Sequence, residues 1–131
     1  TYVEPSLPTD REVYLTDYPK QIECLAEDYD DRPYKKRWEM YIKGVEIANC
    51  YKEETDKEKT RAYFEKEQKK LEEERYGKGE TISKADPNFY TLSLPKCSGG
   101  AIGLDRLLMV EYGGEEIAPL LSFPMNALFE R

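Results

Sequence analysis

RWEMYIKGVEIA, residues 37–48, contains the clearest pattern in this sequence. Apolar and polar side chains alternate up to Ile42 and alternate again from Val45, with Lys43 and Gly44 between the two runs. Alternation with a period of two is typical of strands with two different faces, and a short turn containing glycine joins such strands. The stretch therefore predicts a β-hairpin with its turn at Lys43 and Gly44.

The turn decides which side chains share a face of the hairpin. A two-residue turn puts Ile42 opposite Val45, and the side chains then alternate between the faces from that point outward. The predicted polar face carries Glu39, Tyr41, Glu46 and Ala48. The predicted core face carries Trp38, Met40, Ile42, Val45 and Ile47.

Two carboxylates on the polar face suggest a metal site. Glu39 and Glu46 are diagonal neighbours in this register, with their Cβ atoms about 7 Å apart. Two carboxylates at that separation converge on a hard cation, and Mg²⁺ is commonly held by a few carboxylates and phosphate oxygens. The alternative is two exposed glutamates on a solvated sheet face, where glutamate is common.

The hairpin continues into a second polar group. Asn49 and Glu53 suggest a pocket for an amine, with Tyr51 as its wall. Strict alternation puts Asn49 on the core side, so this pocket requires a bulge or a bend. The alternative is an ordinary strand end that leads to the next helix.

That helix is predicted from its capping pattern. Thr55 and Glu58 have the spacing of a capping box, with the threonine at the N-cap. From there to Arg75 the chain is mostly charged, which indicates a solvated helix. Before the hairpin, Val13–Leu15 is predicted to form a short strand.

The segment Cys97–Leu104 is predicted to be a glycine-rich strand that leads into a buried helix over 105–112. It has neither the Gly-Lys-Ser/Thr ending of a P-loop nor the spacing of a dinucleotide fingerprint. A strand with few side chains lets a flat ligand approach, and Arg106 is suited to stacking or phosphate contact. Asp105 is suited to cap the helix. The alternative is tight strand–helix packing with a surface ion pair.

Composition excludes several functional classes. The 131 residues are enough for one domain, and the net charge of −7 argues against a nucleic-acid surface as the main feature. The sequence contains no apolar run of about 18 residues, so no membrane span is predicted. Three cysteines and no histidine argue against a zinc site and exclude a Ser–His or Cys–His pair within the chain. A reducing cytoplasm is the expected location.

Taken together, these motifs resemble the C-terminal half of the catalytic domain of class II lysyl-tRNA synthetases. The resemblance rests on Glu39 with Glu46, on Ala48-Asn49-x-Tyr51-x-Glu53, and on the segment from Gly99 to Leu107, which is similar to class II motif 3. It implies an α+β fold with an antiparallel sheet flanked by helices, with residues 1–131 as the C-terminal part of the domain. Motifs 1 and 2 are expected to precede residue 1, so the isolated chain is expected to be inactive and the full-length protein to be a homodimer.

The resemblance also implies a role for each site residue. Glu39 and Glu46 are implied to hold the Mg²⁺ that accompanies ATP. Gly103 and Arg106 are implied to line the ATP site, with Arg106 as the catalytic residue. The implied amino-acid site consists of Asn49, Tyr51, Glu53 and Ala101. The implied chemistry is attack of the amino-acid carboxylate on the α-phosphate of ATP, which gives an aminoacyl-adenylate.

Three departures from the synthetase pattern affect the expected acceptor. Ala48 and Ala101 stand where lysyl-tRNA synthetases usually have glycine, and those enzymes lack the Cys97-Ser98 pair. These features are more similar to the paralogous ligase that attaches a lysine-type amino acid to elongation factor P. Lysine or a lysine analogue is the expected substrate, and elongation factor P is the expected acceptor, with tRNA(Lys) as the alternative. A non-catalytic binding module is the third hypothesis. Cys50 replaces a glycine that is usual in both groups, which leaves the local strand geometry open.

Overall fold

The computed structural model describes residues 3–75, 84, 86, 88 and 93–124. The chain forms two compact units. The first unit comprises residues 1–17, 37–50 and 100–131, and the second comprises residues 18–36 and 51–99. Among the described residues, neither helix is both long enough and apolar enough to span a membrane.

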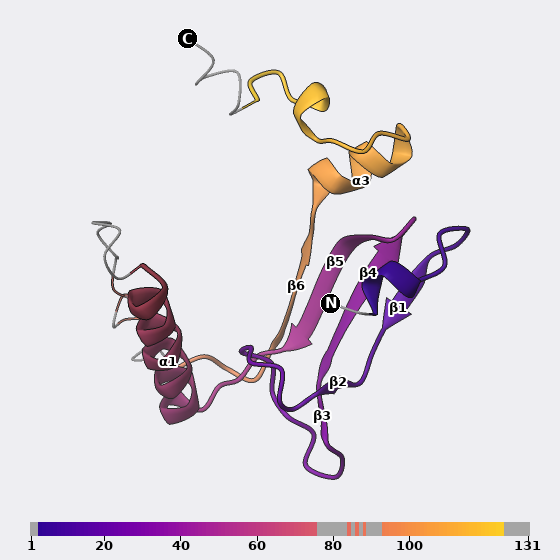
Figure 1. Ribbon diagram of the computed structural model, residues 1–131. Helices are drawn as coiled ribbons and strands as arrows, with labels where there is room; N and C mark the ends of the chain where they lie inside the picture. The colour runs from indigo at the N-terminus through magenta and orange to yellow at the C-terminus, as the bar shows by residue number, and fades with distance from the viewer. Residues whose placement is uncertain (1–2, 76–83, 85, 87, 89–92, 125–131) are drawn as a thin grey trace. The chain divides into compact units, whose positions relative to one another are not determined.

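An antiparallel sheet organises the chain. Its four strands are β1 (Val13–Leu15), β4 (Arg37–Ile42), β5 (Val45–Lys52) and β6 (Ser98–Ile102), in the order β1-β4-β5-β6 (Figure 1). β1 pairs antiparallel with β4. With helices α1 (Lys57–Arg75) and α3 (Leu104–Glu111), this sheet confirms the predicted α+β class.

The predicted hairpin turn is also confirmed. Lys43 has φ 50° and Gly44 has φ 78°, so both central residues are in the left-handed region. This is the backbone of a type I′ turn, whose twist matches that of the flanking strands. Lysine is an unusual residue for positive φ, and its ammonium donates to the Val110 carbonyl oxygen at 3.1 Å.

The glycine-rich strand is shorter than predicted, since β6 covers Ser98–Ile102 rather than residues 97–104. Its pairing with β5 is fixed by backbone hydrogen bonds. The Gly103 N–H donates to the Ile47 oxygen at 2.8 Å, and the Glu53 N–H donates to the Cys97 oxygen at 3.0 Å. Partners descend along β6 as they ascend along β5, so the two strands are antiparallel.

The core of the first unit lies between the hairpin and α3. Ile47, Met109 and Val110 are its buried members. The half-buried residues that pack against them are Met40, Ile42, Val45, Leu107, Ile117 and Leu120, the last from the 3₁₀ turn η2 (Ala118–Leu120). This confirms most of the predicted core face.

Ile47→Val is expected to destabilise the first unit by about 1 kcal/mol, because it removes one methylene from a core position that is only 2% exposed. The matched control is Ile102→Val, at a position that is 60% exposed, with an expected effect below about 0.5 kcal/mol. Denaturant unfolding measures both changes. Equal losses for the two variants would contradict the placement of the core.

Three details of the predicted elements are wrong. Trp38 is 37% exposed and packs edge-to-face on Tyr14, outside the cluster beneath α3. α3 buries only one face, since Leu104 and Leu108 are exposed. The N-cap of α3 is Gly103, and Asp105 lies inside the first turn without capping it. Within the described part of the chain, nothing buries the outer face of this eight-residue helix.

The predicted polar face of the hairpin is buried at Glu39 and Tyr41. Glu39 is 6% exposed and Tyr41 is 3% exposed, so the alternative of a solvated glutamate at position 39 is wrong. The Tyr41 hydroxyl lies 3.4 Å from a Glu4 carboxylate oxygen. Glu4 belongs to the 3₁₀ turn η1 (Glu4–Ser6), which the sequence had not suggested, so this N-terminal segment reaches the Glu39 face.

The second unit holds α1 and a two-stranded antiparallel sheet of β2 (Tyr18–Pro19) and β3 (Tyr34–Lys35). The predicted helix is confirmed, but its predicted N-cap is wrong. Asp56, not Thr55, accepts hydrogen bonds from the N–H groups of Glu58 and Lys59. Asp56 is itself a favoured N-cap residue, and its carboxylate also suits the positive end of the helix dipole.

Candidate active site

Glu39 lies at the centre of a buried polar cluster in the first unit. The Arg37 guanidinium donates from Nη2 to Glu39 Oε1, and the Tyr41 hydroxyl donates to Glu39 Oε2 at 2.7 Å. Residues 37, 39 and 41 alternate along β4, which places their side chains on one face of the strand. The carboxylate is therefore held in one orientation by a cation on one side and a hydroxyl on the other.

Asn49 joins this cluster. Arg37 Nε donates to Asn49 Oδ1 at 3.1 Å, so one guanidinium holds both the carboxamide and the Glu39 carboxylate. Strict alternation from the Lys43 turn places Asn49 on the opposite face from Glu39. The long Arg37 side chain nevertheless reaches the Asn49 carboxamide while it also holds Glu39.

The first unit also brings Glu46 and Arg106 together. Arg106 Nη1 lies 3.2 Å from the Glu46 backbone oxygen and 3.4 Å from its Oε2. The arginine side chain is 50% exposed and the glutamate 38%. The surface ion pair considered as the alternative is thus present, but such an exposed pair contributes at most about 1 kcal/mol and leaves the planar guanidinium accessible.

The donor chemistry of Glu39 and Glu46 fits Mg²⁺. Carboxylate oxygens are hard ligands, and Mg²⁺ in proteins is commonly held by one or two carboxylates together with substrate phosphates and water. Among the residues that the structure describes, no group of three or more His, Cys, Asp or Glu is placed to hold a metal. Glu39 and Glu46 offer two carboxylates, so Mg²⁺ held by them would take its remaining ligands from phosphate and water.

The small residues of the glycine-rich segment have different surroundings. At Gly103 the atoms nearest to an added Cβ belong to the Arg106 side chain and lie at 3.5 Å or more, so this position does not require glycine. Ala101 is exposed on β6. Cys50, whose geometry the sequence left open, sits in regular strand β5 and packs beside Gly100.

Glu53, the acid of the predicted amine pocket, belongs to the second unit. It follows β5, and its backbone is fixed from two sides by an antiparallel bridge to Ala26 and by the hydrogen bond to Cys97. Its carboxylate lies against Gly99, where an added Cβ would be 2.7 Å from Glu53 Oε1. The predicted pocket wall, Tyr51, is half-buried in the same unit.

Among the residues that the structure describes, Glu53 differs from its acidic neighbours in having no cation partner. Among the described residues, its carboxylate makes no hydrogen bond or ion pair, and burial raises its pKa. Lysines contact the carboxylates of the neighbouring acids Glu23, Glu27, Asp28 and Glu54. A half-buried carboxylate that has no such partner among the described residues, next to acids such as Glu27 and Glu54 that do, is suited to bind a cation from outside the chain.

Glu27 provides the contrast and a testable pH dependence. Its hydrogen bonds to Lys36 and Lys52 lower its pKa to about 2. A depressed pKa contributes stability above the ordinary value of 4.5, and that stability is lost as pH falls toward 2. Glu27→Gln is therefore expected to cost about 1 kcal/mol at pH 7 and progressively less below pH 4.5.

Denaturant unfolding at pH 7 and at about pH 2.5 checks this expectation. Glu73→Gln is the control, because Glu73 is exposed on α1 and lies 3.8 Å from Lys69. The control is expected to change stability by less than about 0.5 kcal/mol at either pH. A Glu27→Gln cost that stays the same at both pH values would contradict the role of the two lysines.

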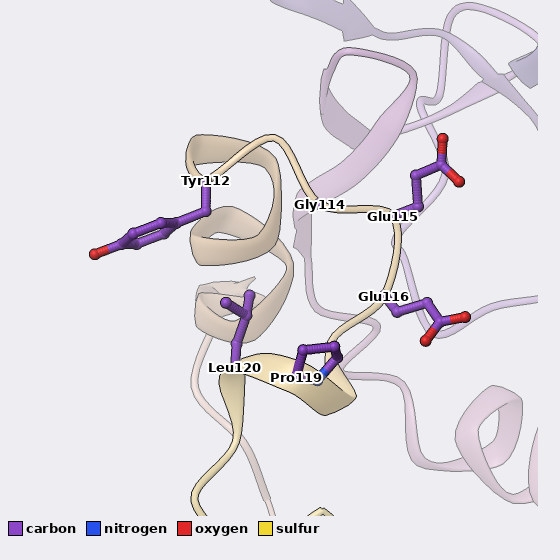
Figure 2. A pocket seen from close by; sticks show the side chains of 6 residues that line it. All are labelled: Tyr112, Gly114, Glu115, Glu116, Pro119 and Leu120. Atoms are coloured by element: carbon purple, nitrogen blue, oxygen red, sulfur yellow. The ribbon is translucent and has the colours of Figure 1, made fainter.

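A hollow after α3 is not part of this polar site. It is lined by Tyr112, Gly114, Glu115, Glu116, Pro119 and Leu120. Figure 2 shows that Tyr112 points away from the two glutamates, so the polar groups do not converge on one point. A second hollow runs along α3 between Leu104 and Glu111 and is mainly apolar. Neither includes Glu39, Glu46 or Arg106.

Sequence reasoning missed two residues of the site. Arg37 holds Glu39 and Asn49, and its position two residues before Glu39 on a predicted strand was the available signal. Gly99 makes room for the Glu53 carboxylate, and no local pattern indicates that contact, because the two residues are far apart in the sequence.

Comparison with known proteins shows the family of this chain. The family model of tRNA synthetases class II (D, K and N) matches residues 7–127. Elongation factor P–(R)-beta-lysine ligases from Proteus mirabilis and Pectobacterium atrosepticum are 34% and 33% identical over 94% and 95% of this chain. The corresponding ligase from Yersinia pestis is 32% identical over 95% of the chain. The chain covers 38% of the length of each of these relatives. It belongs to the family of class II tRNA synthetases (D, K and N).

Proposed function

We propose that this chain is the C-terminal part of the catalytic domain of a ligase that activates lysine or a lysine analogue with ATP and transfers it to elongation factor P. Membership of the class II family and similarity to ligases that are named for this acceptor support a ligase of this type. Homodimerisation of the full-length protein and a cytoplasmic location are parts of the same proposal.

The Glu53 carboxylate is the observation that carries the proposal. A lysine-type substrate has a permanently charged ammonium at neutral pH, and a half-buried carboxylate without a cation partner among the described residues suits it. Tyr51 would lie along the aliphatic stem of the substrate. Asn49 and Ala101 would complete the amino-acid site.

The proposed chemistry is attack of an amino-acid carboxylate oxygen on the α-phosphorus of ATP. A new P–O bond forms, the bond to the pyrophosphate leaving group breaks, and an aminoacyl-adenylate results. Gly103 and Arg106 would line the nucleotide site, and Arg106 would stabilise charge on the α-phosphate. Glu39 and Glu46 would hold Mg²⁺, which when bound neutralises phosphate charge. No histidine is needed, because the work is positioning and charge stabilisation.

The test uses the longer protein of which we propose this chain is a part. The purified protein is given ATP, Mg²⁺ and radiolabelled lysine or β-lysine, with either elongation factor P or tRNA(Lys) as the acceptor. Label on elongation factor P supports the proposal. The 131-residue chain alone is expected to catalyse no lysine-dependent ATP–pyrophosphate exchange.

A lysyl-tRNA synthetase is the second candidate, and the match to a family model that includes the lysine enzymes favours it. Label on tRNA(Lys) but not on elongation factor P would establish this candidate and overturn the proposed acceptor. Absence of amino-acid-dependent exchange in the longer protein would instead favour a non-catalytic binding module.

A further inference from the structure

We propose that Gly99 is a positioning residue for the amino-acid site, because it leaves the space that the Glu53 carboxylate occupies. The inference rests on the proposed function, since it gives Glu53 the substrate ammonium as its partner. It concerns β6, the glycine-rich strand, which the proposed nucleotide contacts of Gly103 and Arg106 do not explain at this position.

The contact at Gly99 is unusually close. A Cβ built there would lie 2.7 Å from Glu53 Oε1 and 3.8 Å from the carboxylate carbon. Gly100, the next residue, provides the contrast, because its Cβ would meet Cys50 at 3.5 Å and the Asn49 oxygen at 3.7 Å. Those are ordinary van der Waals distances. A methyl group at Gly99 would therefore collide with the Glu53 carboxylate, whereas a methyl group at Gly100 would fit.

A Cβ added at Gly99 would displace the Glu53 carboxylate and would leave the strands in place. The Glu53 backbone is held by its bridge to Ala26 and by its N–H bond to Cys97, and the neighbouring Glu54 N–H donates to Leu25. Oε1, in contrast, is the end of a flexible side chain. Gly99→Ala should therefore fold normally and turn the carboxylate away from its position.

A displaced carboxylate changes binding of the amino acid and not of ATP. In the longer protein, Gly99→Ala is expected to raise the KM for lysine in ATP–pyrophosphate exchange about tenfold or more, since a misplaced charge pair loses most of its contribution. The KM for ATP is expected to stay within about twofold. Gly100→Ala is the matched control and is expected to leave the KM for lysine within about twofold.

A double-mutant cycle separates positioning from a general effect on the strand. Glu53→Asp shortens the side chain by one methylene and withdraws the carboxylate from the added methyl. Gly99→Ala alone is expected to raise the KM for lysine about tenfold. When Glu53 is already aspartate, Gly99→Ala is expected to raise the KM for lysine by less than about twofold. Circular dichroism and thermal unfolding verify that each variant is folded.

Two outcomes would overturn the inference. One is equal behaviour of Gly99→Ala and Gly100→Ala, and the other is an unchanged effect of Gly99→Ala in the Glu53→Asp background. Failure of the proposed function is distinguishable, because in that case the parent protein shows no lysine-dependent exchange, or Glu53→Gln itself leaves the KM for lysine unchanged.

Discussion

Glu53→Gln, made in the longer protein, is expected to weaken binding of lysine about 100-fold. Glutamine keeps the shape of the side chain and can still accept a hydrogen bond, so the change removes mainly the charge. Removing one partner of a half-buried charge pair costs about 2–5 kcal/mol, and 100-fold corresponds to about 2.7 kcal/mol. Equilibrium binding of lysine at saturating ATP measures the change.

The same variant is expected to be at least as stable as the parent protein in the absence of substrate. Burial raises the pKa of Glu53, so the folded state holds its proton more tightly than the unfolded state does. The stability that this group contributes is fully present below its unfolded pKa and is lost as pH rises through the folded pKa. At neutral pH the charged carboxylate therefore opposes folding, and glutamine removes that opposition.

Glu54→Gln is the matched control for both measurements. Glu54 is adjacent in the sequence, but its carboxylate lies 3.1 Å from Lys59 and also accepts the Asp56 N–H. Its replacement is expected to lower stability slightly and to leave lysine binding within about twofold. If Glu53→Gln bound lysine as tightly as the parent, or if both variants lost binding equally, Glu53 would not be the ammonium partner.

The sequence predicted the elements that depend on local pattern. The Lys43–Gly44 turn followed from two alternating runs around a glycine, and the helix that ends at Arg75 followed from its capping residues and charge. Both are decided within a few residues. The N-cap was misassigned by one residue because Asp56 and Thr55 are both good capping residues, and only the hydrogen bonds distinguish them.

The remaining features depend on contacts between distant segments. Trp38 is apolar and on the predicted core face, but whether α3 covers it depends on where that helix lies over the strands. The covering of Glu39 involves Glu4, which lies far before it in the chain. The space that Gly99 leaves for Glu53 requires the register of β5 and β6. At these positions the sequence shows whether a side chain is apolar, acidic or absent, but it does not show which distant segment contacts it.

Arg106→Ala is expected to lower kcat/KM for lysine-dependent adenylate formation by about 1,000-fold in the longer protein. Removal of one donor that stabilises charge in a transition state typically costs 10²–10³-fold, roughly, and here a full positive charge is lost as well. Folding is expected to survive, because the ion pair of Arg106 with Glu46 is half exposed and contributes at most about 1 kcal/mol.

Arg106→Lys separates charge from geometry. Lysine restores the positive charge, but its ammonium lacks the planar fork that contacts a phosphate with two parallel donors. It is therefore expected to recover less than about tenfold of the lost kcat/KM. Arg61→Lys, on the exposed surface of α1 beside Glu58, is the control and is expected to stay within about twofold of the parent.

Single-turnover measurement of adenylate formation assigns the Arg106 effect to the chemical step. If Arg106→Ala reduced the rate of that step by less than about tenfold, the contact with Glu46 would be the main role of this arginine. If Arg106→Lys restored full activity, a point charge would be sufficient and the guanidinium plane would be irrelevant. The expected pattern, a large loss with little recovery by lysine, requires a guanidinium that contacts the nucleotide at the start of α3.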